Sequence, residues 1–320
     1  MASPMTLCFL VSKYDESRRN GLIADWTSFE DVGKSFNDEV LTAAEYRRVE
    51  DLYISAVESL ADAVQADRFK LRNLVLNEPP PCWLGAAYEG RSVDRHTALR
   101  LLRRMLRHGL ISCVLASGDV LQVAVDTDFY ISVEIQSDAV HCLEGVKRLG
   151  LHSVPVACDE EESGATMAAS RRADGEFWEE VAQNIALSPG ATVILERWAE
   201  GCCGYRWHPI IDGDLSTIVG SVRPHSLVTA YLDANVQWTS RRHLVPAIAS
   251  AIMGEAIPVV IFSRSMGGVA SEILVLREGD DLPTEAEVPP GDDFGFFLWP
   301  ADDSTSIQAV VRGDGCQSLQ

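Results

Sequence analysis

The chain has 320 residues, of which 47% are hydrophobic and 23% charged, so it is long enough for two domains that each bury a core. Its 47 acidic and 27 basic residues give a net charge of −20. This surplus disfavours binding to nucleic acid, whose phosphate backbone is itself anionic. It suits a basic protein partner, although a need for solubility alone would also produce it.

The chain shows no sign of a membrane segment. No apolar run approaches the ~18 residues that a spanning helix needs. The segment Met1–Leu10 lacks the basic start and long apolar core of a secretion signal. We therefore expect a cytoplasmic protein that does not contact a membrane.

The cysteines are scattered, and several lie inside apolar runs. This pattern is typical of buried free thiols in a reducing compartment rather than of a disulfide framework. The pair Cys202-Cys203 with His208 invites a zinc interpretation, but the spacing matches no common ligand pattern. On a helix, His141 and Cys142 would point about 100° apart. We expect no metal and no cofactor. The eight cysteines are Cys8, Cys82, Cys113, Cys142, Cys158, Cys202, Cys203 and Cys316.

In chain order, a strand is expected at Leu7–Val11, followed by a long helix at 41–67. Thr42 and Glu45 fit a capping box at the start of that helix. Apolar residues then recur at helical spacing on one face for more than four turns. A strand at Phe69–Leu76 follows.

The next expected unit is a helix that leads into a hairpin. Asp94 can cap a helix at Arg95–His108, and Gly109 stands at its usual stop. The hairpin strands are predicted at Leu110–Ala116 and Val120–Ile135. A basic stripe on the helix could be a DNA-reading face, but we favour a surface on which acidic groups pair these arginines. The stripe consists of Arg100, Arg103, Arg104 and Arg107.

The remaining pattern predicts a second strand-rich domain. A short helix at 137–148 precedes an acidic linker at 158–174, so the domains are expected at 1–157 and 175–320. No regular alternation of strand and helix occurs. The fold class is therefore α+β, with two domains that are each a mostly antiparallel sheet with a few packed helices. The later elements are expected as helices at 175–187 and 246–253 and as strands at 192–198, 205–211, 216–222, 227–232, 259–262, 273–276, 294–299 and 307–311.

One segment suggests an enzyme. A strand-like run leads into Ser263-Arg264-Ser265-Met266-Gly267, which resembles the nucleophile elbow of α/β-hydrolases with its first glycine replaced. Ser265 would be the nucleophile, and His243 would have to be its base from an upstream position. Because hydrolases place the histidine after the serine, we favour a hairpin turned by Gly267-Gly268 and keep the serine hydrolase as the alternative.

A second segment carries carboxylates on a predicted strand. If residues 120–135 form one strand, Asp126 and Asp128 lie on one face, where they could share a proton or hold a metal. A solvated sheet face is the simpler interpretation. The same residues could also mark a binding surface with Tyr130 as an aromatic anchor.

The first domain resembles the small acidic immunity proteins encoded beside bacterial toxins. The residues that carry this resemblance are 26–34 (WTSFEDVGK), Leu41-Thr42, Glu45-Tyr46, 48–51 (RVED) and 128–131 (DFYI). It implies a non-enzymatic inhibitor that covers a toxin's active surface. Our leading hypothesis is thus an acidic binding protein with a basic protein partner. The expected contact residues are Asp25, Trp26, Glu30, Asp31, Asp126, Asp128 and Tyr130.

Overall fold

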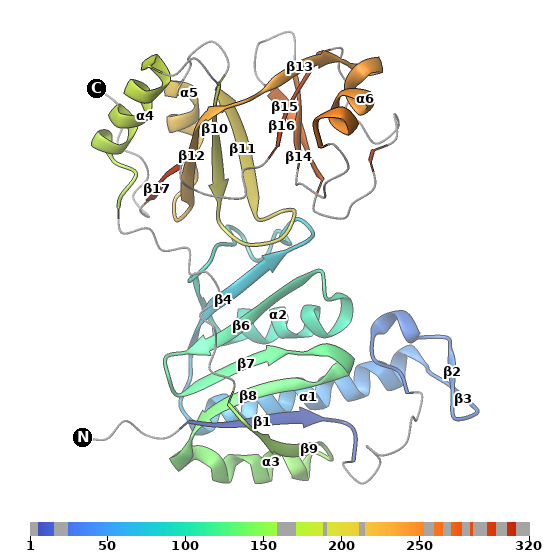
Figure 1. The fold of residues 1–320 in the computed structure, drawn as a ribbon. Helices are drawn as coiled ribbons and strands as arrows, with labels where there is room; N and C mark the ends of the chain where they lie inside the picture. The colour runs from blue at the N-terminus through green and yellow to red at the C-terminus, as the bar shows by residue number, and fades with distance from the viewer. Residues whose placement is uncertain are drawn as a thin grey trace. The chain divides into compact units, whose positions relative to one another are not determined.

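The computed structural model describes residues 6–15, 25–158, 171–187, 191–210, 215–252, 259–264, 270–276, 282–283, 293–298 and 306–311. The chain divides into two compact units. The first unit comprises Met1–Thr166 and Ala199–Gly204, and the second comprises Met167–Trp198 and Tyr205–Gln320. The predicted α+β class is confirmed, because helices pack on mostly antiparallel sheets in each unit (Figure 1). Within the described residues, no helix is long and apolar enough to cross a membrane.

The first unit is built on a seven-stranded sheet with the strand order β5-β4-β6-β7-β8-β1-β9. Strand β1 lies between β8 and β9 and is antiparallel to both, so it is an interior strand of the sheet. The strands are β1 (Thr6–Ser12), β4 (Arg68–Leu76), β5 (Ser92–Asp94), β6 (Ile111–Ser117), β7 (Leu121–Val125), β8 (Ile131–Gln136) and β9 (His152–Val156). A separate small hairpin, β2 (Ser35–Phe36) with β3 (Glu39–Val40), precedes the first long helix.

Two helices pack side by side against one face of this sheet (Figure 1). Helix α1 (Ala43–Ala63) begins after Thr42, whose side chain accepts a hydrogen bond from the Glu45 N–H. It is shorter than predicted, because Gln65 takes a left-handed conformation (φ 56°) that ends the helix. Helix α2 (Arg95–His108) has the predicted bounds, with Asp94 as its N-cap and Gly109 left-handed at its end (φ 62°).

The long predicted strand 120–135 is wrong. A tight turn divides it into β7 and β8, which pair with each other through Val125↔Ile131. In this turn Asp128 and Phe129 have positive φ angles of 56° and 65°, and the Asp126 N–H donates to the Tyr130 carbonyl at 2.9 Å. The two carboxylates therefore do not share a strand face as predicted. The cause is tertiary, because Phe129 turns inward and is only 2% exposed.

The segment after β8 was predicted as one helix. It begins as a 3₁₀ helix, η4 (Ser137–Cys142), and continues as α3 (Leu143–Arg148), which packs against α1 and β9.

The expectation that all cysteines are free thiols is also wrong. Cys8 on β1 and Cys158 beyond β9 form a disulfide, because β1 and β9 are paired neighbours that bring the two residues together. Cys113 is a buried free thiol as predicted, whereas Cys82 and Cys202 are exposed. Cys316 lies outside the described residues.

The second unit contains two four-stranded sheets with the orders β11-β10-β12-β17 and β13-β16-β14-β15. Their described strands are β10 (Ala191–Arg197), β11 (Tyr205–Ile210), β12 (Leu227–Ala234), β13 (Gln237–Ser240), β14 (Val259–Arg264), β15 (Ala270–Leu276), β16 (Asp293–Leu298) and β17 (Ser306–Val310). Helix α4 (Gly175–Leu187) has the predicted bounds.

Two predictions in the second unit need correction. The predicted strand 216–222 is a helix, α5 (Leu215–Ser221), because Leu215, Ile218 and Val222 at helical spacing enter one core with Phe177 and Trp178. Helix α6 (Arg241–Ile252) begins before the predicted start at Pro246, which lies inside it.

Candidate partner-binding site

An aromatic cluster organises one end of the first unit. Phe129, from the turn between β7 and β8, has its ring centroid 5.2 Å from Trp26, 5.5 Å from Tyr46 and 5.0 Å from Tyr53. Phe29 packs edge-on against Tyr46 at 5.2 Å. Such edge-to-face contacts add to the stability gained by burial. Trp26 is only 7% exposed, so it is a buried member of this aromatic cluster.

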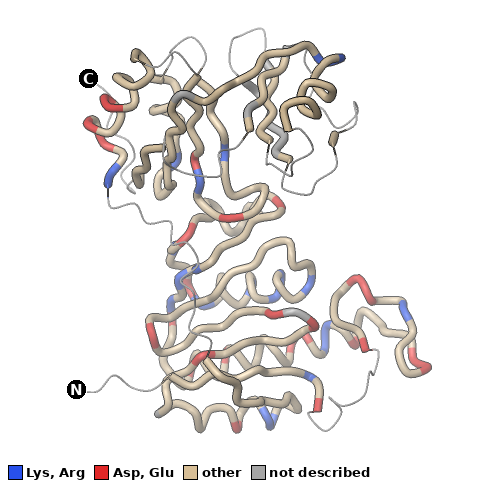
Figure 2. The backbone as a smooth tube through the Cα atoms, viewed as in Figure 1, with Lys and Arg blue, Asp and Glu red and all other residues tan. Residues whose placement is uncertain are grey.

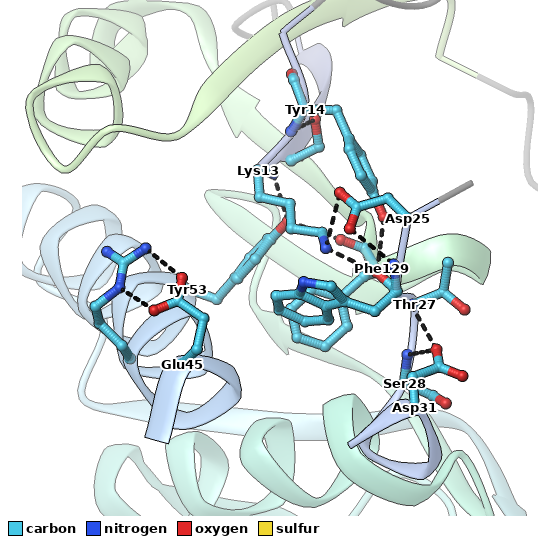
Figure 3. Close-up of polar contacts among 12 residues, drawn as sticks. Lys13, Tyr14, Asp25, Thr27, Ser28, Asp31, Glu45, Tyr53 and Phe129 are labelled. Atoms are coloured by element: carbon cyan, nitrogen blue, oxygen red, sulfur yellow. Dashed lines mark hydrogen bonds and ion pairs between the residues drawn. The ribbon is translucent and has the colours of Figure 1, made fainter. Parts of the chain in front are cut away.

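Lys13, just after β1, holds the segment that begins at Asp25 (Figure 3). Its Nζ donates to the Trp26 carbonyl at 2.7 Å, lies 3.3 Å from Asp25 Oδ2 and sits 3.1 Å from the Trp26 ring centroid. Burial lowers the pKa of Lys13 to about 8, and the charge of Asp25 limits that fall. The Asp25 carboxylate is thus engaged within the fold.

The same lysine is linked to the β7–β8 turn through its backbone. The Lys13 N–H donates to the Tyr53 hydroxyl at 2.7 Å, and that hydroxyl donates to the Phe129 carbonyl at 2.7 Å. Burial raises the pKa of Tyr53, so the phenol stays neutral. One buried hydroxyl therefore joins β1, α1 and the left-handed turn.

Asp31 shapes the short 3₁₀ helix η2 (Phe29–Asp31). Its carboxylate accepts from the Thr27 N–H at 2.8 Å and the Ser28 N–H at 3.2 Å (Figure 3). It also accepts from Lys34 Nζ at 2.8 Å. Burial acts to raise the pKa of Asp31, but these hydrogen bonds outweigh it and hold the pKa below its usual value. Asp31 is therefore a local anchor that presents the neighbouring Glu30 to solvent.

A cavity of about 390 Å³ opens beside η2. Glu30, Asp126 and Asp128 are the carboxylates among its lining residues, and all three are exposed. Phe129 and Met105 lie in its wall as buried residues, and Arg107 and His108 at the end of α2 also line it. The other lining residues are Thr27, Ser28, Leu106, Gly109, Ile111, Ser112 and Val125.

The basic stripe of α2 is largely satisfied within the fold. Arg107 and Arg103 pair with Glu50, and Arg104 pairs with Glu78. Arg100 stacks over the Trp83 ring at 4.3 Å. The predicted pairing of these arginines with acidic groups is therefore confirmed for three of the four.

The structure brings the expected contact residues to one end of the first unit. Glu30, Asp126 and Asp128 line the cavity, whereas Asp25, Trp26 and Asp31 build its support. Tyr130 is half-buried and lies 5.5 Å from the Tyr14 ring. Figure 2 shows acidic positions at the β7–β8 turn, along η2 and at the β2–β3 hairpin. The residues that sequence reasoning missed are Lys13, Tyr53, His108 and Phe129.

The features of the hydrolase alternative lie in the second unit. Ser265 and the two glycines after Met266 fall outside the described residues. Strands β14 and β15 on either side are antiparallel and paired through Arg264↔Ala270. A nucleophile elbow instead leads from a strand into a helix. His243 lies on the exposed side of α6.

The residues considered for zinc fall in different units. Cys202 and Cys203 belong to the first unit, whereas His208 belongs to the second, with its Nε2 2.9 Å from Glu196 Oε2. Hydrogen bonds from His208 and the Arg223 N–H lower the pKa of Glu196 although burial acts to raise it. Across the described ranges, no group of three or more His, Cys, Asp or Glu side chains could hold a metal ion.

No protein-family model matches the chain, and no curated protein or solved structure matches it either.

Proposed function

We propose that this chain is a non-enzymatic acidic binding protein of the immunity or inhibitor type that acts on a basic protein partner. The observation that carries the proposal is the cavity beside η2, with Glu30, Asp126 and Asp128 exposed around it. The net charge of −20 adds a long-range attraction for a basic surface.

The chemistry of the cavity suits a long basic side chain. Lysine and arginine combine an apolar stem with a charged head. The stem would lie along the wall of the cavity, where Val125 is a partly exposed apolar residue, and the head would reach Asp126 and Asp128. Asp128 is well placed for this role, because its left-handed backbone projects it from the tip of the turn.

The supporting contacts favour recognition without rearrangement. The Tyr53 hydroxyl donates to the Phe129 carbonyl, and Asp31 accepts from the backbone that leads into η2. Lys13 holds the Trp26 carbonyl by a further hydrogen bond. A rim that is already ordered loses little conformational entropy when a partner binds. An ordered surface of this kind is typical of an inhibitor that binds another protein without changing its own shape.

The test uses two variants, each with three substitutions. In Glu30→Gln/Asp126→Asn/Asp128→Asn the rim loses three charges, and asparagine is a residue that tolerates the left-handed backbone at 128. The matched control Glu58→Gln/Glu176→Gln/Glu179→Gln removes three exposed charges elsewhere. Each variant and the wild type are immobilised and incubated with a cell lysate at low and at high salt. The captured proteins are then identified by mass spectrometry.

We expect one basic protein to bind the wild type and the control at low salt, and to be lost as salt rises, because screening weakens the attraction between charges. The rim variant should bind that purified protein at least about 10-fold more weakly, a loss of roughly 1.4 kcal/mol. Equal affinity of the rim variant and the control would remove the cavity from the proposal. Capture of no basic protein at any salt would remove the proposal itself.

A further inference from the structure

A second chemical feature lies away from the cavity, on the segment Ala199–Gly204 of the first unit. Cys202 and Cys203 are adjacent in sequence, and their sulfur atoms are 3.9 Å apart. Cys202 is exposed and Cys203 is half-buried, so reagents in solution can reach the pair. The proposed partner-binding function makes no use of these thiols.

The pair is held on a fixed base. The Cys203 N–H donates to the Leu76 carbonyl at 2.7 Å, and the Leu76 N–H donates to the Glu200 carbonyl at 2.8 Å. The Glu200 N–H donates in turn to the Leu74 carbonyl at 2.8 Å. The segment is thus attached to β4 before the thiols, at Glu200, and at Cys203 itself, which limits how far the two sulfur atoms can separate.

Two glycines make this close attachment possible. Gly201 has a φ of 82°, and a Cβ there would lie 2.5 Å from the Leu76 carbonyl oxygen. A Cβ on Gly204 would lie 2.3 Å from the Ala199 carbonyl oxygen. A larger residue at 201 would push the loop away from β4, and one at 204 would clash with the loop's own backbone at Ala199 and Glu200. The sequence Gly-Cys-Cys-Gly therefore presents a dithiol in a defined geometry.

The sulfur separation suits two bonds to one thiophilic atom. Thiolate bonds to such atoms are about 2.3 Å long, so bond angles of roughly 90° to 110° place the sulfurs ~3.3–3.8 Å apart. Small side-chain rotations close the difference from 3.9 Å. Zinc would need further ligands, and no group of three or more His, Cys, Asp or Glu side chains suited to a metal lies in the described part of the chain.

We propose that Cys202 and Cys203 form a chelating dithiol site for trivalent arsenic or antimony compounds, which need only two thiolates from the protein. In the balanced reaction with an organoarsenic oxide, the arsenic forms two bonds to sulfur. The two thiol protons leave with the oxide oxygen as water, and no oxidant or reductant takes part. Burial and the neighbouring Cys202 raise the pKa of Cys203, so this thiol carries its proton near neutral pH before reaction.

The test uses phenylarsine oxide with the full chain, and no thiol reagent is added before the competition step, so that the Cys8–Cys158 disulfide is intact when the adduct forms. Intact-mass spectrometry should show one phenylarsenic group per chain, and a thiol assay should show two fewer reactive thiols. The adduct should tolerate roughly 100-fold more competing monothiol than a one-cysteine adduct, because the second sulfur rebinds at high effective concentration. A small dithiol should reverse it.

Variants identify the thiols involved. Cys202→Ser and Cys203→Ser should each lose the monothiol-resistant adduct, whereas Cys82→Ser, at another exposed free cysteine, should keep it. Unchanged circular dichroism would show that each variant is folded. Absence of a resistant adduct in the wild type, or its survival in a folded Cys203→Ser protein, would overturn the assignment.

Discussion

Arg107 on α2 grips Glu50 on α1 through both carboxylate oxygens, with Nε 2.6 Å from Oε1 and Nη2 2.8 Å from Oε2. Arg103 adds a third contact to Oε2 at 3.0 Å. The Glu50 side chain is completely buried, whereas the two guanidinium groups remain about one-third exposed. The buried Glu50 carboxylate therefore depends on the two arginines for its counter-charge, whereas water can solvate the arginines.

This asymmetry predicts unequal costs of mutation. The double variant Arg103→Met/Arg107→Met leaves a buried carboxylate without a counter-charge and should lower the free energy of unfolding by about 3–5 kcal/mol. Glu50→Gln leaves two cations that water can reach, so it should cost less. Urea unfolding followed by circular dichroism measures both. The exposed pair Arg48→Met/Arg68→Met is the control and should cost under about 1 kcal/mol. A larger loss for Glu50→Gln than for the double variant would contradict this account.

Lys13 predicts a pH dependence of stability. Its pKa is lowered from 10.5 to about 8 in the folded protein. Between these values the unfolded chain holds a proton that the folded chain lacks, so stability rises with pH, by at most about 1.4 kcal/mol per pH unit. Below pH 8 both states are protonated and this contribution is constant.

The measurement compares wild type with Lys13→Met. The difference in unfolding free energy, wild type minus variant, should increase from pH 8 to pH 9.5. Tyr14, Tyr46 and Tyr53 have raised pKa values and act with the opposite sign above pH 10, but both proteins contain them. A difference that is flat over this range would show that Lys13 keeps an ordinary pKa.

The Tyr53 hydroxyl is predicted to support the β7–β8 turn. Tyr53→Phe removes the acceptor of the Lys13 N–H and the donor to the Phe129 carbonyl, and should cost about 1–3 kcal/mol because buried backbone groups lose their partners. Tyr14→Phe is the comparison and should cost less, since the Trp26 carbonyl keeps its bond from Lys13 Nζ. Equal costs in thermal unfolding would count against the special role of Tyr53.

The Cys8–Cys158 disulfide predicts a loss of stability on reduction. The two cysteines are separated by 150 residues, and the loop-entropy relation for this length gives an upper value of about 5 kcal/mol. Cys158→Ser should lower the melting temperature in the absence of reductant, and added reductant should then have no further effect. Cys82→Ser, at an exposed free thiol, should change stability by no more than about 0.5 kcal/mol.

The sequence was most informative where local signals agreed with packing. Helix α2 has an aspartate cap, an apolar stripe and a terminal glycine, and its bounds match the prediction. The turn at Asp128-Phe129 could not be found in this way, because turns with two left-handed residues usually contain asparagine or glycine. Here the aromatic cluster selects phenylalanine, and no local pattern reports a contact with Tyr53, which is distant in sequence.

In the candidate site too, the sequence indicated some residues, but it could not reveal contacts between distant segments. The exposed carboxylates Glu30, Asp126 and Asp128 were named from composition and spacing, and the structure places them around one cavity. Their support by Lys13 depends on β1 lying beside β8, which is a pairing between distant segments. The disulfide was missed for the same reason, since the pairing of β1 with β9 brings its cysteines together.

The segment Ala199–Gly204 matters when the first unit is expressed without the rest of the chain. A fragment that stopped at Thr166 would lack the backbone groups that bond to Leu74 and Leu76, and would present that part of β4 bare to water. Half-length clones should therefore precipitate or associate more readily than the intact polypeptide. Isolating the N-terminal portion calls for a short tether that returns these six residues to it.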